Sequence, residues 1–439
     1  MLIHDWDEWS LVSAIPPILA IAVATAWSLY ILAYPPVYKK LSIALLGIPA
    51  AYAFIHHEAI APDFTLSDTI GRFMYIWYAH MSYEVIILEF QPTADKENLG
   101  WKSKLNQAYR VIWDRNHAPF IKDKALLQEK TRRASLQDDQ GVQETIVTNT
   151  TTTTTTSSSS RRGKETNHGY SYARFTLHHA LQFILLIVSI TLNDLFRNSY
   201  YGPSLSFTFD ASPSSFFRRL PASLDREELY YRAQCCWDWT VISLFEYELY
   251  YSLCALVFVS ILRWDAPSEW PLSLCGHLSE AWSVRQYWGR HWHNYIYHSF
   301  TAHTRIVTRS WMGLARGHLT TRLLENTIVF AVSGFMHTVV RWVQSPGGNH
   351  WPITLWYIAQ MLPIVLESMA QHYWRMARKR LVLQKHAKWL GALELAVGYV
   401  WVAGWFMWSV PKYNAAGAEW RMVNIEYEMG QGVGAARNG

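Results

Sequence analysis

The sequence predicts an all-α, polytopic membrane protein with about eight transmembrane helices, and three observations support this fold class. Half of the 439 residues are hydrophobic, 15% are aromatic and only 17% are charged. Long apolar runs recur along the chain, and about 20 mostly apolar residues are enough to cross a bilayer as a helix. The mean hydropathy of −0.03 averages these runs with one long polar insert, so the runs decide the class.

Eight apolar runs are candidate spans. The acidic N-terminus "MLIHDWDEW" lacks the basic segment of a cleavable signal peptide, so we expect the first span to remain in the mature protein. The third and sixth runs carry the most polar residues. In chain order, the candidate spans cover residues 11–34, 41–57, 70–90, 177–196, 240–262, 324–343, 353–373 and 389–410.

The distribution of charge predicts the topology. Lysines 39 and 40 follow the first span, and "RMARKR" (375–380) follows the seventh. Because cytoplasmic loops collect Lys and Arg near membrane ends, we expect a lumenal N-terminus and strict alternation. The insert and the segment near 280–320 then lie on the cytosolic side. The endoplasmic reticulum is the expected membrane.

Composition divides the chain into five regions. The insert contains "TNTTTTTTTSSSSRRGKE" (148–165), a low-complexity tract that we expect to be disordered. A loop at about 198–232, rich in Ser, Pro, Tyr and Phe, should be lumenal. The regions are N-terminal transmembrane helices (1–91), the cytosolic low-complexity insert (92–172), central helices with the lumenal loop (173–277), a motif-bearing region (278–410) and a C-terminal tail (411–439).

Several functional classes lack the residues that they need. A net charge of +5 fits a basic cytosolic face and calls for no nucleic-acid partner. The four cysteines, two of them adjacent, lack zinc-ligand spacing, and no histidine set has the spacing of a membrane di-iron site, so we expect no metal. The G-x-S-x-G, H-E-x-x-H and P-loop patterns are missing, as are H-x-x-x-D and H-x-x-x-x-D.

A histidine lies in the middle of the apolar stretch "IVFAVSGFMHTVVRW" (328–342). On a helix it belongs to a stripe of residues that recur at three- or four-residue steps. A histidine facing the bundle interior is kept neutral by its apolar surroundings, as a general base must be. The alternative is that it only hydrogen-bonds a neighbouring helix. The stripe consists of Asn326, Phe330, Ser333, His337 and Arg341.

The segment 279–321 is rich in arginine, histidine and aromatic residues, with Glu280 almost its only acid. Trp and Tyr favour the membrane interface, so this segment is either a surface anchor or a cationic surface for a phosphorylated carrier. The segment contains Arg285, Arg290, Arg305, Arg309 and Arg316, and Arg322 directly follows it.

Two motifs in this part of the chain resemble a known family. "SVRQYWGRHWHN" (283–294) is similar to the S-x-R-x-F-W-G-R-R-W-H signature of wax synthase-like acyltransferases, which belong to the membrane-bound O-acyltransferase (MBOAT) group. "AVSGFMHTV" (331–339) resembles their second signature, a buried S-G-x-x-H. Tyr287 stands where Phe is usual, and His291 stands where a second Arg is usual.

The resemblance implies helices around an intramembrane tunnel, with 278–410 as the catalytic region. Acyl-CoA enters from the cytosol as a co-substrate, with no bound cofactor, and the acceptor is a hydrophobic alcohol from the lipid or lumenal side. His337 matches the family's catalytic histidine. His293, the second expected catalytic residue, occupies a position that is polar in related enzymes, and either His293 or Asn294 would orient the thioester or stabilise the developing oxyanion. The resemblance assigns Arg285, Trp288, Arg290, Trp292 and Asn294 to the acyl-CoA site, and the stripe adds Ser333, Asn326 and Arg341 for the acceptor.

The expected reaction is the transfer of an acyl group, acetyl above all, to a hydroxyl of a terpenoid or meroterpenoid secondary metabolite of fungal type. One alternative is wax ester synthesis from long-chain alcohols. A different class is a transporter or proton channel in which His337, Arg341 and Asn326 form the relay, and a third is a scaffold without turnover. The sequence assigns no oligomeric state.

Overall fold

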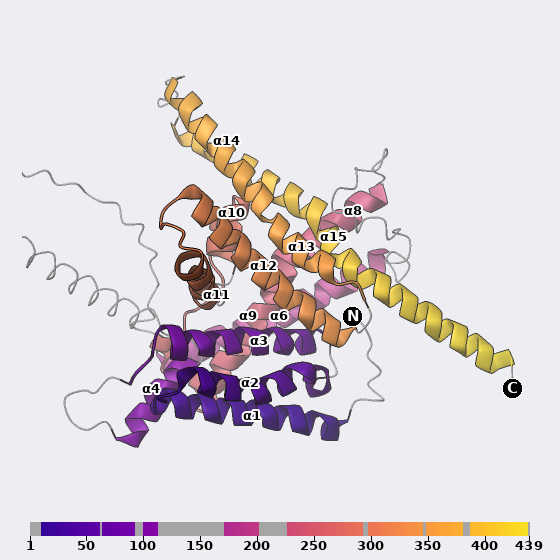
Figure 1. The fold of residues 1–439 in the computed structure, drawn as a ribbon. Helices are drawn as coiled ribbons and strands as arrows, with labels where there is room; N and C mark the ends of the chain where they lie inside the picture. Colours follow the sequence, from indigo (N-terminus) through magenta and orange to yellow (C-terminus); the bar gives the residue numbers. More distant parts are fainter. Residues whose placement is uncertain are drawn as a thin grey trace, which may run out of the picture.

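The computed structural model describes residues 10–61, 64–92, 100–112, 171–201, 226–292, 297–345, 348–380 and 387–437, which contain helices and no strand (Figure 1). This confirms the predicted all-α class. The α-helices are α1 (Leu11–Ala33), α2 (Lys39–Ile55), α3 (Phe64–Ser82), α4 (Trp101–Ile112), α6 (Tyr172–Tyr201), α8 (Arg226–Trp237), α9 (Ser243–Ala255), α10 (Val284–Gln286), α11 (Tyr297–Arg305), α12 (Leu319–Gln344), α13 (Trp351–Ala359), α14 (Met361–Arg380) and α15 (Ala387–Arg437).

Short 3₁₀ and π-helical turns adjoin these helices, and several of them continue a helix without a break. The 3₁₀ turns are η1 (His57–Ile60), η6 (Pro267–Glu269) and η7 (Leu278–Glu280). The π-helical turns are η2 (Tyr83–Ile87), η4 (Asp238–Ile242), η5 (Leu256–Ile261), η8 (Tyr287–His291) and η9 (Ile306–Trp311).

Six helical segments are long and apolar enough to cross a membrane, by length and composition alone. The prediction of about eight spans is therefore too high for the described part of the chain. The run 41–57 forms α2, whose 17 residues measure about 25 Å, and the run 70–90 falls on α3 and η2, which bury Asp68, His80 and Glu84. The six segments are Leu11–Ala33, Tyr172–Arg197, Glu228–Ile261, Leu319–Gln344, Trp351–Arg378 and Trp389–Asn414.

Helices α1, α2 and α3 lie side by side at one end of the molecule, with α4 against α1 (Figure 1). The indole nitrogen of Trp27 in α1 donates to the carbonyl oxygen of Ser42 in α2 at 3.0 Å. Buried apolar side chains, among them Leu46, Met74 and Met81, fill the space between the helices. Because α3 also contacts α12, this N-terminal group of helices reaches the part of the chain that carries His337.

The predicted insert 92–172 contains a helix. Helix α4 buries Ala108, Val111 and Ile112 against the N-terminal helices and leaves Trp101 and Lys102 exposed, so it is amphipathic. The low-complexity tract 148–165 lies outside the described residues.

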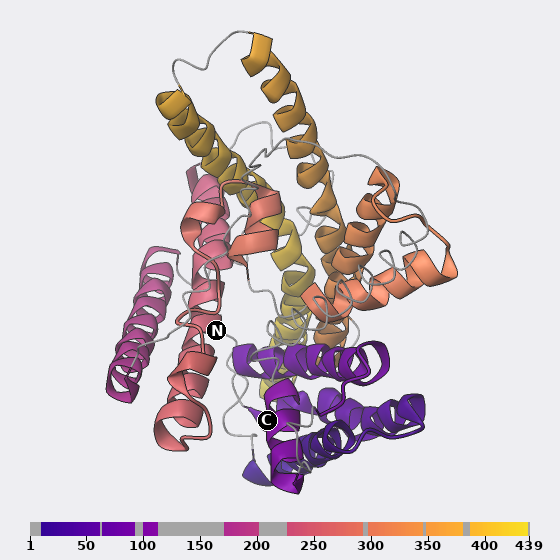
Figure 2. The ribbon, with the colours of Figure 1, turned by 90° about the vertical axis from the view of Figure 1, so that its left-hand side faces the viewer.

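The central helices are longer than their apolar runs. Helices α8 and α9 with η4 and η5 form one helical segment from Arg226 to Ile261, and α6 lies beside α9 (Figure 2). The predicted loop 198–232 is therefore shorter at both ends, since α6 extends to Tyr201. Polar side chains are accommodated where the helices meet: Asn193 and Gln234 both donate to the carboxylate of Asp238, at 3.1 and 2.8 Å. Hydropathy alone therefore predicts these helices to be too short, because it leaves out their polar ends.

The predicted boundary at 410/411 falls inside α15, which continues through Pro411. A proline within a helix leaves the carbonyl four residues earlier without its usual donor. Here that carbonyl, of Met407, accepts a hydrogen bond from the Arg232 guanidinium in α8 at 3.4 Å. Pro411, Lys412 and Tyr413 are buried, so the expected tail begins in the core of the protein.

Candidate active site

Helices α12 and α13 lie close together at Gly334, the glycine of the second signature. A Cβ atom added there would lie 2.8 Å from Cβ of Tyr357 and 2.9 Å from Cα of Thr354. The hydroxyls of Thr338 and Thr354 are 2.7 Å apart, and the Thr338 hydroxyl donates to the carbonyl oxygen of His350 at 3.2 Å. Only glycine permits this crossing, and the crossing brings side chains of the two helices into contact.

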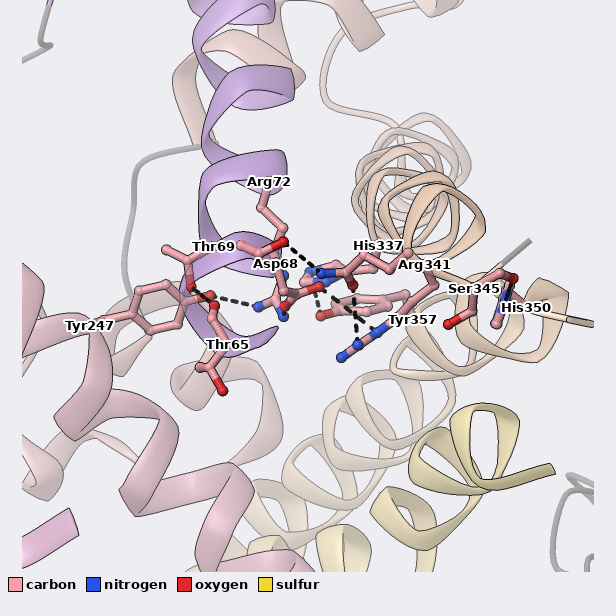
Figure 3. A network of polar contacts seen from close by, with 12 residues as sticks. Thr65, Asp68, Thr69, Arg72, Tyr247, His337, Arg341, Ser345, His350 and Tyr357 are labelled. Carbon is pink, nitrogen blue, oxygen red and sulfur yellow. Dashed lines mark hydrogen bonds and ion pairs between the residues drawn. The ribbon is translucent and has the colours of Figure 1, made fainter. Parts of the chain in front are cut away.

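His337 lies on the buried face of α12, with 8% of its surface exposed. Its Nε2 atom is 2.7 Å from the hydroxyl oxygen of Tyr357 in α13, within hydrogen-bond distance. The two rings are nearly parallel, at an interplanar angle of 13°, with centroids 4.7 Å apart (Figure 3). A bond to a neighbouring helix, which the sequence left as the alternative to catalysis, is thus present, and it occupies one ring nitrogen.

A buried ionic network adjoins this pair (Figure 3). Asp68 of α3, with a side chain only 3% exposed, pairs with Arg72 one turn later and lies 3.8 Å from Nε of Arg341 in α12. Arg72 also donates to the hydroxyl of Tyr247 in α9 at 2.9 Å. Arg341 is one turn beyond His337 on the same helix, so the network fixes α12 against α3 beside the histidine.

Two side chains hold the start of the first signature. The Ser283 hydroxyl accepts from the backbone N–H of Gln286 at 3.1 Å, as an N-cap does. The carboxylate of Glu367 in α14 accepts from the backbone N–H groups of Val284 and Arg285, at 2.6 and 3.1 Å. These N–H groups have no partner within the helix itself, so the serine of the motif and a distant glutamate satisfy them.

Asp68, Glu367 and Tyr357 are among the residues of this site that were not predicted from the sequence. Asp68 and Glu367 are acidic residues that are buried in largely apolar helices. Burying an acidic side chain within a membrane helix costs free energy, so such a residue is a candidate for a functional role. The presence of an acid in an apolar helix was therefore the signal in the sequence that could have identified these two residues. Tyr357 belongs to the aromatic run "WPITLWYIAQM" (351–361), where nothing distinguishes it from a packing residue.

The tryptophans of the first signature pack into an aromatic core. The indole nitrogen of Trp288 donates to the side-chain oxygen of the buried Gln360 at 3.3 Å, and its ring lies 6.1 Å from that of Tyr357. Trp292 is buried and stacks on Trp239, with centroids 5.9 Å apart. Trp288 therefore connects the first signature to the helix pair that carries the second.

The arginines of the first signature lie at the surface. Both are exposed: Arg285 donates to the Ser368 hydroxyl, and Arg290 lies 3.8 Å from the carboxylate of Glu280. Among the arginines that follow, Arg309 is bound by the carboxylate of Glu325 through two hydrogen bonds of 2.7 and 3.1 Å. The others leave a cationic surface near the start of α12, formed by the exposed Arg305, Arg316 and Arg322.

His291, which replaces the usual second arginine of the signature, is buried. Its Nδ1 lies 2.9 Å from the carbonyl oxygen of Gly276, and burial lowers the pKa of the imidazole. Gly276 is needed for this contact, since an added Cβ would lie 2.0 Å from the carbonyl oxygen of Arg290. The replacement of the usual arginine by His291 therefore removes a positive charge from a position that faces the protein interior.

The remaining predicted site residues differ in their distance from His337 along the chain and in their burial. Ser333 is buried one turn before His337, and Arg341 belongs to the ionic network, whereas Asn326 is exposed three turns before His337. His293 and Asn294 lie outside the described residues. Within the described ranges, no three His, Cys, Asp or Glu side chains are grouped so that they could hold a metal ion.

Tyr287→Phe should leave stability unchanged or raise it by up to about 1–3 kcal/mol. The Tyr287 side chain is 1% exposed, and its hydroxyl has no hydrogen-bond partner among the described residues, which costs free energy. The thermal unfolding midpoint in detergent measures the effect. Tyr251→Phe is the matched control, because that hydroxyl donates to the carbonyl oxygen of Pro271 at 2.6 Å and its loss should destabilise. A lower midpoint for Tyr287→Phe would contradict the assignment.

Comparison with known proteins identifies the region that carries both signatures. Residues 270–359 match the model of the membrane bound O-acyl transferase family. The chain is 30% identical over 207 residues to acetyltransferase nanB of Aspergillus nanangensis, covering 47% of this chain and 45% of that protein. It is 27% identical over 251 residues to acetyltransferase aurG of Calcarisporium arbuscula, covering 55% and 57%.

A third relative is acetyltransferase TRI7 of Fusarium sporotrichioides, 24% identical over 181 residues that cover 40% of each chain. The chain spans about half the length of the curated relatives that it matches. These relatives agree with the family that the two motifs predicted. Residues 270–359, with both signatures, His337 and Tyr357, are thus the part of the chain that matches the membrane bound O-acyl transferase family.

Proposed function

We propose that this protein is a membrane-bound O-acyltransferase that moves an acetyl group from acetyl-CoA to a hydroxyl of a hydrophobic acceptor, a terpenoid or meroterpenoid. The observation that carries the proposal is His337, an imidazole buried at the crossing of α12 and α13 within the region that matches the family. The names of the relatives, all acetyltransferases of fungi, support acetyl as the group transferred.

The reaction needs one base and no covalent intermediate on the protein. His337 takes the proton of the acceptor hydroxyl on a ring nitrogen, and the oxygen attacks the thioester carbonyl. The tetrahedral intermediate collapses, the carbon–sulfur bond breaks, and the leaving thiolate recovers the proton from His337. A positioned base contributes about 10²–10⁴-fold in rate, and holding the two substrates in line in a dry site contributes more.

The cationic surface suits the nucleotide end of the donor. Arg305, Arg316 and Arg322 are exposed near the start of α12, where guanidinium groups can bind phosphates. Arg322 lies in the first turn of α12, about 22 Å along the helix axis from His337 by the helical rise. The phosphates would then stay at the surface, while the extended thioester arm reaches into the membrane.

The test compares donors and acceptors in microsomes from yeast that expresses the protein. Acetyl-CoA with a panel of hydroxylated terpenoids should give esters, and microsomes from yeast with an empty vector should give none. Ester formation only from palmitoyl-CoA and long-chain alcohols would favour the wax ester reaction. If liposomes containing the purified protein show ion flux and no thioester cleavage, the protein is a transporter or channel instead.

A further inference from the structure

We propose that the end of α1, the start of α2 and the first turn of α4 together form a binding surface for the headgroups of anionic phospholipids. This surface, called the α4 surface below, is built on helices other than those that carry His337 and Tyr357, and it does not depend on the proposed function. Its residues are Val37, Tyr38, Lys40, Trp101, Lys102 and Lys104.

The apolar part of the α4 surface lies where a candidate span ends. Helix α1 is long and apolar enough to cross a membrane, and it stops at Ala33. In the connection to α2, Val37 is 90% exposed and Tyr38 is 74% exposed, and Trp101 at the start of α4 is 60% exposed. Tyr and Trp favour the level of the lipid headgroups, where one side of the ring is apolar and the other is wet. These exposed side chains therefore suit the membrane interface.

Lysines lie among these aromatic side chains. Lys104 Nζ is 5.1 Å from the centroid of the Tyr34 ring, which directly follows α1, and Lys102 Nζ is 5.7 Å from the centroid of the Trp101 ring. Within the ranges that the structure describes, neither these two lysines nor Lys40 pairs with a carboxylate. Their positive charge is therefore available to an anionic group outside the protein.

The second half of α4 fixes the helix to the protein. The imidazole Nε2 of the buried His80 in α3 lies 2.9 Å from the carbonyl oxygen of Val111, within hydrogen-bond distance. Arg110 pairs with Glu269 of η6, and α4 contacts α1 along its length (Figure 1). The first turn of α4 is thereby held at the end of α1, so its lysines have a fixed level relative to the span.

An anionic phospholipid fits both parts of this surface. The phosphate and carboxylate groups of a headgroup such as phosphatidylserine bind ammonium groups, and the adjoining chains are in contact with the aromatic rings. Lys39 and Lys40 predict this end of α1 to be cytosolic, and the cytoplasmic leaflet is the one that carries phosphatidylserine. Lys39 adds no net charge, because it pairs with Glu89. Each of the other lysines near the membrane surface contributes about fivefold in affinity.

Native mass spectrometry of the purified full-length protein tests this proposal. The protein would be placed in detergent micelles that contain equal amounts of phosphatidylserine and phosphatidylcholine. We expect the wild type to retain phosphatidylserine in preference, and we expect Lys102→Gln/Lys104→Gln to lower the ratio of the two retained lipids at least about fivefold. Lys102→Arg/Lys104→Arg keeps both charges and should match the wild type. Lys40→Gln, on a different helix, should lower the ratio about fivefold and decides the question if the double variant does not accumulate as folded protein.

Arg375→Gln is the control that separates position from charge. Arg375 is an exposed residue of α14, also predicted to be cytosolic, and α14 and α4 lie in opposite parts of the molecule (Figures 1 and 2). Its loss should leave the lipid ratio at the value of the wild type.

Three results would overturn the proposal. The first is a wild type that retains both lipids equally, and the second is an equal loss of phosphatidylserine from Arg375→Gln, which would make selectivity a property of net charge. The third is an unchanged lipid ratio in the Lys102→Gln/Lys104→Gln variant. If that unchanged ratio came with a higher KM for acetyl-CoA, the lysines would bind the acyl donor instead. None of these results bears on ester formation by His337, which is measured separately.

Discussion

His337→Ala should lower the rate of ester formation by about 10²–10⁴-fold, the contribution of a positioned general base. The loss should appear in kcat, because the imidazole acts on the proton that moves during the reaction and contributes little to binding the substrates. Initial rates with acetyl-CoA and an accepted alcohol measure it. The substitution also deletes a buried polar group together with its hydrogen bond to Tyr357, so the thermal unfolding midpoint must be recorded beside the rate.

His372→Ala is the control for this prediction. His372 is an exposed residue of α14, so the same chemical change there should leave both the rate and the unfolding midpoint at the values of the wild type. Full activity in His337→Ala would remove the histidine from the mechanism. It would also leave the bond to Tyr357 as a purely structural contact between α12 and α13.

Asp68→Asn should lower the free energy of unfolding by about 3–5 kcal/mol, the cost of removing one partner from a buried ion pair. Asp68 is the carboxylate shared by Arg72 and Arg341, and its side chain is 3% exposed. The amide keeps the size of the side chain and removes its charge, which leaves two guanidinium groups without that counter-ion. Because Arg341 follows His337 by one turn, activity should fall as well.

Glu89→Gln is the matched control for the ion-pair prediction. Glu89 pairs with Lys39 at 3.0 Å, but its side chain is 61% exposed, and exposed pairs contribute at most about 1 kcal/mol. Unfolding midpoints of both variants in the same detergent compare the two pairs directly. A midpoint for Asp68→Asn no lower than that of Glu89→Gln would show that the buried network does not hold α3 to α12.

The sequence located the catalytic candidate but not its partners. Helical periodicity was enough to place His337 and Ser333 on one face, because that spacing is local. The residues that complete the site, Tyr357 and Asp68, lie on other helices, and their contacts follow from how α12 crosses α13 and α3. At Gly334 the two helices are so close that an added Cβ atom would lie 2.8 Å from Cβ of Tyr357, and no pattern along the chain encodes the angle between two helices.

The arrangement of the described residues differs from two expectations for the same reason. Periodicity put Asn326 on the histidine's face, yet a face is buried only where a neighbouring helix covers it, and Asn326 is exposed. Hydropathy predicted that a tail begins at 411, yet Tyr413 lies in the aromatic core because α15 packs on α8. Local signals predict the class and the faces of the helices, and packing decides which part of each face is used.

Transfer of labelled acetyl by the purified protein tests the central claim most directly. The protein, reconstituted in lipid vesicles, would receive acetyl-CoA labelled in the acetyl group and a terpenoid alcohol that the microsome assay has selected. We predict that labelled ester and free CoA appear in equal amounts, that the label does not remain on the protein, and that the His337→Ala variant forms at least about 100-fold less ester. Thioester cleavage without ester, or ester formed equally by both proteins, would contradict the account.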